Sequence, residues 1–257
     1  MHSYIVTGAS KGLGAALVRA LLRPGNSVFG VSRSLNEALI AESNEAGVEL
    51  HWVQADLAET LSIDAFMATI AERIELEGSE SITLVNNAAT LAPLGRIGAS
   101  SDDEVEQGVR VNLIAPMILT HSFIRHFGGA RVRRTVINVS SGAGIAPMPG
   151  LSTYSTTKAG LNMFTRAAAQ EHGSDAEGSE FRFYAVSPGT VDTGMQESLR
   201  EAGPSILPNH ETYVEWKETG SLTSPEDAAN AVLTLLDRDD MENGTFVHRS
   251  DLTTEDR

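Results

Sequence analysis

The chain has 257 residues, which fits one large α/β domain or two small ones, and its 41% hydrophobic residues are enough for a buried core. A formal net charge of -15 disfavours nucleic acid and anionic membranes as partners, because both would repel the protein at long range. The absence of cysteine excludes disulfides, thiolate metal sites and cysteine nucleophiles. No signal peptide or apolar stretch of membrane length is evident, so we expect a cytoplasmic protein.

Short strand-like segments alternate with longer helical ones along almost the entire chain. Apolar and β-branched runs predict strands at 3–7, 27–32, 49–54, 82–86, 135–139, 181–186 and 245–248. Helical periodicity predicts helices at 12–22, 36–46, 62–77, 102–127, 153–172 and 225–236. Several strands are apolar at nearly every position, which is typical of strands that are covered on both faces.

This alternation predicts a single α/β domain over residues 1–257, because strand–helix–strand units form a parallel sheet with right-handed crossovers. We expect a Rossmann fold, a doubly wound parallel sheet of about seven strands with helices on both faces. One segment, 189–223, has no evident strand and contains Pro204, Pro208 and Trp216. Irregular insertions of this kind usually lie over the ligand crevice, so we predict a substrate lid, with a plain surface excursion as the alternative.

A glycine-rich turn directly follows the first predicted strand. The spacing Gly-x-x-x-Gly-x-Gly at 8–14 lets the backbone turn tightly and approach a pyrophosphate, which would lie on the positive end of the next helix. Three glycines in a turn can be merely structural, but this turn opens a βαβ unit, which predicts a dinucleotide site. We expect the cofactor to contact Gly8, Ser10, Lys11, Gly12, Leu13 and Gly14.

The end of the second predicted strand indicates which nicotinamide cofactor is bound. NAD sites usually place an acidic residue there to accept from the ribose hydroxyls. This chain instead has Ser32 and Arg33, with no carboxylate before Glu37, and Lys11 lies nearby in the glycine turn. A hydroxyl and two cations suit the 2′-phosphate of NADP(H), although both cations could be ordinary solvated side chains. Asp56, after the third strand, is placed to bond the adenine amino group or simply to cap the following helix.

Further motifs follow in a fixed order along the chain. Asn-Asn-Ala-Ala at 86–89 comes after the fourth strand, Ser141 after the fifth, and Pro-Gly at 188–189 after the sixth, while Tyr154 and Lys158 stand four residues apart. With the glycine turn, these motifs resemble the short-chain dehydrogenase/reductase family over nearly the whole chain, except that alanine ends the family's Asn-Asn-Ala-Gly. The resemblance implies further cofactor contacts at Leu57, Asn87, Ala88, Tyr154, Lys158, Pro188, Gly189, Val191 and Thr193.

The same resemblance assigns catalysis to Asn112, Ser141, Tyr154 and Lys158. Carbonyl reduction needs a proton at oxygen, but a free tyrosine has a pKa of about 10, roughly three units too high for efficient transfer at neutral pH. Lys158, on the same helix face, is expected to lower this pKa and, as in the family, to hold the ribose hydroxyls. Ser141 would bond the substrate oxygen, and Asn112 a water that connects Lys158 to solvent. Spacing alone assigns the neighbouring Ser140 to a turn.

The segments 5–14, 158–166, 191–196 and 218–222 resemble most closely the sepiapterin reductase and benzil reductase group of this family. The resemblance implies NADPH-dependent reduction of one keto group of a vicinal dicarbonyl or an aryl ketone to a secondary alcohol. An apolar wall is expected to line the substrate pocket, formed by Ile145, Met148, Leu151, Met195, Leu199 and Trp216.

Two other functions are compatible with this fold. A sensor or scaffold could bind NADP(H) without turnover, although it need not keep the Tyr, Lys, Ser and Asn set, and an NAD-linked alcohol dehydrogenase is disfavoured by Arg33. The 7 histidines form no metal-ligand spacing with carboxylates, so we expect no metal. Family members pair through two long helices, here 102–127 and 153–172, so the resemblance implies a homodimer or homotetramer.

Overall fold

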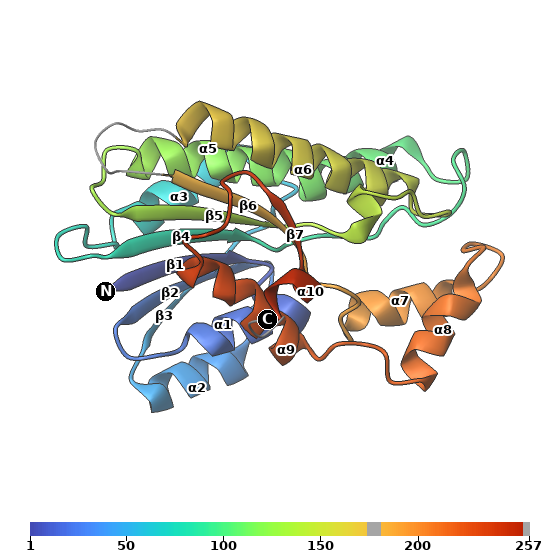
Figure 1. Cartoon of the computed structure of the whole chain (residues 1–257), viewed down its shortest axis with the longest axis horizontal. Coiled ribbons are helices and arrows are strands. Elements are labelled where there is room, and N and C mark those ends of the chain that lie inside the picture. Colours follow the sequence, from blue (N-terminus) through green and yellow to red (C-terminus); the bar gives the residue numbers. More distant parts are fainter. Residues whose placement is uncertain (174–180, 254–257) are drawn as a thin grey trace.

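The computed structural model describes residues 1–173 and 181–253, and its centre is one sheet of seven parallel strands (Figure 1). The strands are β1 His2–Thr7, β2 Asn26–Ser32, β3 Glu49–Gln54, β4 Ser81–Asn86, β5 Arg133–Val139, β6 Phe181–Ser187 and β7 Phe246–His248. Their order is β3-β2-β1-β4-β5-β6-β7, so β1 to β3 extend to one side and β4 to β7 to the other. The predicted doubly wound parallel sheet is confirmed.

Helices cover both faces of the sheet, as predicted (Figure 1). One face carries α1 Gly12–Leu21, α2 Glu37–Ala46 and α9 Pro225–Leu233. The other face carries α3 Ile63–Ala71, α4 Asp102–Val109, α5 Ala115–Phe127 and α6 Ser152–His172, and the short α10, Arg249–Leu252, follows β7. No helix in the described ranges is both long and apolar enough to cross a membrane.

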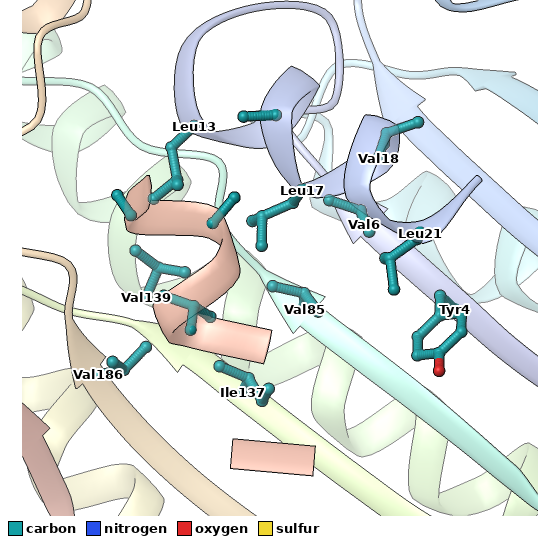
Figure 2. Packing of buried hydrophobic residues seen from close by; sticks show 14 of the residues in the cluster. Tyr4, Val6, Leu13, Leu17, Val18, Leu21, Val85, Ile137, Val139 and Val186 are labelled. Carbon is teal, nitrogen blue, oxygen red and sulfur yellow. The ribbon is translucent and has the colours of Figure 1, made fainter. Parts of the chain in front are cut away.

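The apolar strands explain the two buried layers that hold the helices in place. Leu17 of α1 is fully buried in one cluster with Val6 of β1 and Val85 of β4 (Figure 2). On the opposite face, Phe123 of α5 belongs to a second cluster with residues of β1, β2, β4, β5 and β6. A fully buried side chain of this size contributes roughly 1.5–3 kcal/mol by leaving water, so the two layers stabilise the sheet that positions the site.

The turns that follow β1 and β4 meet where the strand order reverses. In open α/β sheets, ligands bind at such a point, in the crevice at the carboxyl ends of the strands. The Thr7 hydroxyl joins the two turns, because it accepts hydrogen bonds from the backbone N–H groups of Asn87 (3.0 Å) and Ala88 (3.1 Å) and donates to the carbonyl of Val85 (3.3 Å). The end of β1 therefore positions both turns.

The long helix predicted over 102–127 is interrupted in the structure. A π-helical segment, Arg110–Ile114, joins α4 to α5 and contains Asn112. The side chain of Asn112 is hydrogen-bonded to the main chain of Thr90, far from it in the sequence. Such local widening of a helix is frequent at functional sites. The apolar pattern could not reveal it, because the partner of Asn112 comes from another part of the fold.

Two other predicted helices are shorter than expected. The helix predicted over 62–77 corresponds to α3, which ends at Ala71. The helix predicted over 225–236 corresponds to α9, which ends at Leu233 and continues as a tighter 3₁₀ turn. Helices often end in such turns, because the tighter hydrogen bonds satisfy carbonyls of the last turn, and the apolar pattern does not separate the two kinds of helix.

The segment 189–223 leaves the sheet after β6 and returns to almost the same place. It contains α7 Gly194–Ala202 and α8 His210–Glu218, which lie beyond the carboxyl ends of the strands (Figure 1). At its base, the N–H of Asp192 donates to the carbonyl of Thr223 (2.9 Å), and the N–H of Thr223 donates to the carbonyl of Thr190 (2.9 Å). The two ends of the segment are thus fastened together beside the ligand crevice.

Candidate active site

A cavity of about 530 Å³ opens at the carboxyl ends of the strands. All of the predicted cofactor residues line it: Gly8, Ser10, Lys11, Gly12, Leu13, Gly14, Ser32, Arg33, Asp56, Leu57, Asn87, Ala88, Tyr154, Lys158, Pro188, Gly189, Val191 and Thr193. Ser141 and five predicted substrate residues line it as well: Met148, Leu151, Met195, Leu199 and Trp216. The fold therefore gathers residues from distant parts of the chain around one space.

The glycine turn after β1 is folded tightly on itself. Gly8 and Gly12 have positive φ angles of 68° and 55°, a region that other residues rarely adopt. A Cβ atom at Gly14 would collide with the carbonyl oxygen of Gly8. The side-chain amide of Asn87 donates to the carbonyl of Thr7 (2.9 Å) and holds the turn closed. Glycine at all three positions is thus required by the packing of the turn.

The cavity is positively charged although the protein is acidic overall. Among the described residues that line it, the cations are Lys11, Arg33 and Lys158, and the one carboxylate is Asp56. Lys11 and Arg33 are exposed and form no ion pair within residues 1–173 and 181–253. Asp56 accepts a hydrogen bond from the backbone N–H of Ala58 (3.0 Å), so it also caps the next turn. This charge distribution favours an anionic ligand group beside Lys11 and Arg33.

Tyr154, in the first turn of α6, lies beside Ser141, which follows β5, so that the serine hydroxyl acts on the pKa of the tyrosine. The Ser141 oxygen accepts the backbone N–H of Ala143 (3.1 Å), so its own hydrogen is available for donation to Tyr154. A Cβ atom at Gly144 would lie 2.8 Å from the carbonyl carbon of Lys158. Glycine at 144 therefore lets the turn after β5 pack directly against α6, which brings the serine to the tyrosine.

Burial is the main influence on the two titratable groups of the site. It raises the pKa of Tyr154 above its usual value, while the hydrogen bond from Ser141 acts in the opposite direction. The net shift of this pKa is thus upward, opposite to the lowering that we expected from Lys158, because desolvation of the phenolate is the largest effect. Lys158 is 2% exposed, and burial lowers its pKa to about 8.

Comparison with known proteins identifies the family to which these motifs belong. A family model described as short chain dehydrogenase matches residues 3–203. The chain belongs to the short-chain dehydrogenase family. It is therefore an oxidoreductase, and the resemblance that the order of motifs predicts is confirmed. The seven-stranded parallel sheet with helices on both faces is the fold of this family.

This short-chain dehydrogenase is similar to two kinds of reductase along almost its full length. Benzil reductase ((S)-benzoin forming) of Bacillus cereus is 36% identical over 249 residues, which cover 96% of this chain and 98% of that protein. Sepiapterin reductase of Bos taurus is 30% identical over 256 residues, which cover 95% and 92%. Among solved structures, the KRED1-Pglu enzyme has a TM-score of 0.81 at 28% identity, with 96% of this chain and 100% of that chain covered. The predicted resemblance to this group is confirmed.

Asn112 does not line the cavity of this dehydrogenase and is fully buried. Its Oδ1 accepts the backbone N–H of Thr90 (2.8 Å), and its Nδ2 donates to the carbonyl of Thr90 (2.8 Å) and to the hydroxyl of Thr157 (3.4 Å). Both amide hydrogens are engaged, so a water held by this side chain would have to donate to its Oδ1. Asn112 also anchors the segment whose Thr90 and Leu91 line the cavity.

Two assignments at the turn after β5 need correction. Ile145, predicted in the substrate pocket, is 66% exposed and does not line the cavity, because it lies at the outer end of a turn whose inner residues pack against α6. Ser140, predicted merely to make a turn, is buried, lines the cavity and donates to Oδ1 of Asn162 (2.5 Å). Ser140 therefore ties β5 to α6 beside the site.

Several cavity residues were missed by sequence reasoning, namely Thr90, Leu91, Gln107, Val111, Gln196 and Tyr213. Most come from loops or from α4 and α7, and no local pattern marks them, because tertiary packing alone brings them to the cavity. One signal was present for Tyr213, which stands three residues before Trp216 in a helical patch. Their rings pack edge to face with centres 5.5 Å apart, so both belong to the same wall.

Proposed function

We propose that this protein is an NADPH-dependent carbonyl reductase that converts one keto group of a vicinal dicarbonyl or an aryl ketone to a secondary alcohol. The observation that carries the proposal is that Ser141, Tyr154 and Lys158 line one cavity with the glycine turn. A sensor would need neither an acid nor a second hydroxyl beside it. The names of the similar proteins, benzil reductase and sepiapterin reductase, support a substrate of this class.

The residues around the turns after β1, β2 and β3 fit NADP(H). Lys11 and Arg33 have no ion-pair partner among the described residues and can take a 2′-phosphate, while Asp56 can accept from the adenine amino group. A carboxylate in place of Arg33 would favour NAD instead. When bound, NADPH supplies the hydride that forms the new C–H bond and is oxidised to NADP⁺.

Tyr154 is the proton donor in this proposal. As the carbonyl carbon gains the hydride and the C=O π bond breaks, the oxygen takes the phenolic proton of Tyr154. Because burial raises the pKa of Tyr154, its hydroxyl stays protonated over the neutral range, as an acid requires. The Ser141 hydroxyl can turn to the same substrate oxygen, where a second hydrogen bond orients the carbonyl and stabilises the developing negative charge.

Lys158 acts on the phenolate that remains after the proton has moved. Its Nζ lies 5.6 Å from the centre of the Tyr154 ring, and its positive charge lowers the free energy of that anion. One of its three N–H groups donates to the carbonyl of Val139 (2.7 Å), and the others are available for the ribose hydroxyls. Activity therefore depends on Lys158 being protonated.

We propose that residues 189–223 form a substrate lid. Side chains from α7 and α8 complete an apolar wall that suits aryl groups, formed by Met148, Leu151, Met195, Leu199 and Trp216. Asp192 and Lys217, paired at 2.7 Å, link the beginning of the lid to α8. Both side chains are partly exposed, so this ion pair contributes about 1 kcal/mol at most and does not prevent opening.

We also propose that copies of this chain form a dimer or tetramer through the helices α4, α5 and α6. Apolar side chains are exposed on these helices and on the π-helical segment, namely Val105, Ile114, Met117 and Met163. We infer that these side chains are covered when two copies of the chain associate. Light scattering should give a dimer or tetramer for the wild type, and Met163→Lys should shift the population toward the monomer.

The proposed reaction is tested by NADPH oxidation with a panel of diketones, aryl ketones and pterins. Tyr154→Phe should lower kcat/KM by about 10²–10⁴-fold, because it removes the proton donor, while NADPH binding measured by fluorescence is retained. Tyr4→Phe is a matched control, since Tyr4 is also a buried tyrosine but belongs to the α1 side of the core. It should leave the rate unchanged.

The alternatives give different results in the same assay. Tight NADPH binding without turnover of any compound would favour a sensor or scaffold. A clear preference for NADH would overturn the role of Arg33 and Lys11 and favour an NAD-linked dehydrogenase. Retained activity in Tyr154→Phe would contradict the mechanism.

A further inference from the structure

Apolar and aromatic side chains form much of the wall at the substrate end of the cavity. Leu91, Leu151, Leu199 and Tyr213 form a buried cluster with Tyr154, and Met148, Met195 and Trp216 pack against it. A carbonyl oxygen inside such a wall needs a hydrogen-bond donor, because its removal from water is otherwise unfavourable. A vicinal dicarbonyl has two such oxygens. Tyr154 and Ser141 account for the oxygen that reacts, and the other one needs a donor of its own.

Gln196 has a side-chain amide that can supply that donor. It lies in the first turn of α7, lines the cavity and is three residues before Leu199, so the two side chains share one side of the helix. Its Oε1 is buried without a hydrogen-bond partner, and its amide makes no side-chain hydrogen bond to any residue in the described ranges. A buried amide oxygen without a partner is uncommon in folded proteins, because it forfeits its hydrogen bonds to water.

We propose that Gln196 recognises the second oxygen of the substrate, and this inference rests on the proposed function. No partner fixes the amide of Gln196, so it can turn its Nε2–H toward a carbonyl oxygen beside the reacting one. That contact holds the dicarbonyl at both oxygens and selects which keto group faces Tyr154. Gln196 is thus a specificity residue that distinguishes vicinal dicarbonyls from monoketones of the same shape.

A pair of probes isolates the second oxygen. Benzil carries two adjacent keto groups between two phenyl rings, and deoxybenzoin differs only in that one keto group is a CH₂. We would measure kcat/KM for both compounds with NADPH, using the wild type, Gln196→Leu and Gln196→Glu. Glu197→Leu serves as the matched control, because Glu197 is the exposed neighbour on the same helix.

The ratio of kcat/KM for benzil to kcat/KM for deoxybenzoin should fall about tenfold in Gln196→Leu, the effect of losing one hydrogen bond. It should fall at least as far in Gln196→Glu, whose carboxylate has the same shape but no N–H to donate and repels a carbonyl oxygen. Glu197→Leu should keep the wild-type ratio. NADPH binding and the melting temperature, measured for every variant, should stay near the wild-type values.

An equal loss for both compounds would overturn the proposal, because it would assign Gln196 to α7 or to the cofactor rather than to the second oxygen. Weaker NADPH binding in Gln196→Leu would do the same. If the wild type binds NADPH but reduces neither compound nor any other member of the panel, the proposed function fails and this inference with it. Reduction of benzil by the wild type with an unchanged ratio in the variants would leave the proposed function standing and reject Gln196 alone.

Discussion

Nζ of Lys158 donates a hydrogen bond of 2.7 Å to the main-chain carbonyl of Val139, the last residue of β5. This contact ties α6 to the sheet and holds the ammonium group beside the ring of Tyr154. The same enclosure removes the ammonium from water, and burial lowers its pKa to about 8. The charge that the proposed mechanism needs is therefore lost at a pH only slightly above neutrality.

The pH dependence of the reaction should report this shift. Lys158 is protonated below pH 8 and neutral above it, whereas Tyr154, whose pKa is raised by burial, remains protonated throughout this range. We therefore expect kcat/KM for NADPH in the reductive direction to fall as the pH rises through about 8, since this quantity reports the free enzyme. Steady-state rates from pH 6 to about 10 would measure the midpoint.

Ser141→Ala identifies the group that titrates. The hydrogen bond from Ser141 lowers the pKa of Tyr154, so its removal should raise that pKa further and slow the reaction without moving a midpoint that belongs to Lys158. A midpoint that moves upward in Ser141→Ala would instead assign the titration to Tyr154. A flat profile up to pH 10 would contradict the required protonation of Lys158.

Much of this architecture can be predicted from the sequence because it depends on local patterns. Several strands are apolar at nearly every position, which reveals where they lie, and all seven are within two residues of the expected bounds. The glycine turn is equally local, since Gly8, Gly12 and Gly14 are required by the backbone of the turn itself. The spacing between Ser141 and Tyr154 selected the serine whose hydroxyl acts on the pKa of the tyrosine.

The remaining features depend on contacts between distant segments. The π-helical widening at Asn112 accompanies a bond to Thr90, and nothing around residue 112 predicts that partner. Ile145 is apolar and close to Ser141 in sequence, yet its turn leaves it at the surface. Gln196 looks like an ordinary helix residue until α7 is seen against the cavity. Residues whose roles depend on where a loop or lid packs are those that the sequence does not reveal.

The cofactor preference should depend on Arg33 and Lys11. Arg33→Ala removes a cation that can form charge-assisted hydrogen bonds with a 2′-phosphate, so the dissociation constant for NADPH should rise by about 10–100-fold. The constant for NADH, which lacks that phosphate, should change little. Lys11→Ala should have a smaller effect in the same direction. Fluorescence titrations with both cofactors at one fixed ionic strength provide the measurement.

Arg131→Ala is the control for charge alone in that experiment. It removes one positive charge, as Arg33→Ala does, but Arg131 is exposed just before the amino end of β5, away from the cavity. NADPH should bind this variant as tightly as the wild type, apart from a small change that added salt removes. If Arg33→Ala weakened NADPH and NADH equally, Arg33 would be contacting a part that both cofactors share.

Asn112 should matter more for stability than for chemistry. Its fully buried amide pairs with both main-chain groups of Thr90, and Asn112→Ala would leave those groups and the hydroxyl of Thr157 short of partners. Loss of such buried hydrogen bonds should lower the free energy of unfolding by about 2–3 kcal/mol, which urea denaturation would measure. Asn44→Ala, on the exposed side of α2, should change it by less than about 0.5 kcal/mol.

Because Thr90 lines the cavity, KM for the carbonyl substrate should rise in Asn112→Ala while the pH midpoint assigned to Lys158 stays in place. A stable Asn112→Ala protein whose midpoint has moved would show that Asn112 acts on the proton path rather than on the position of this segment.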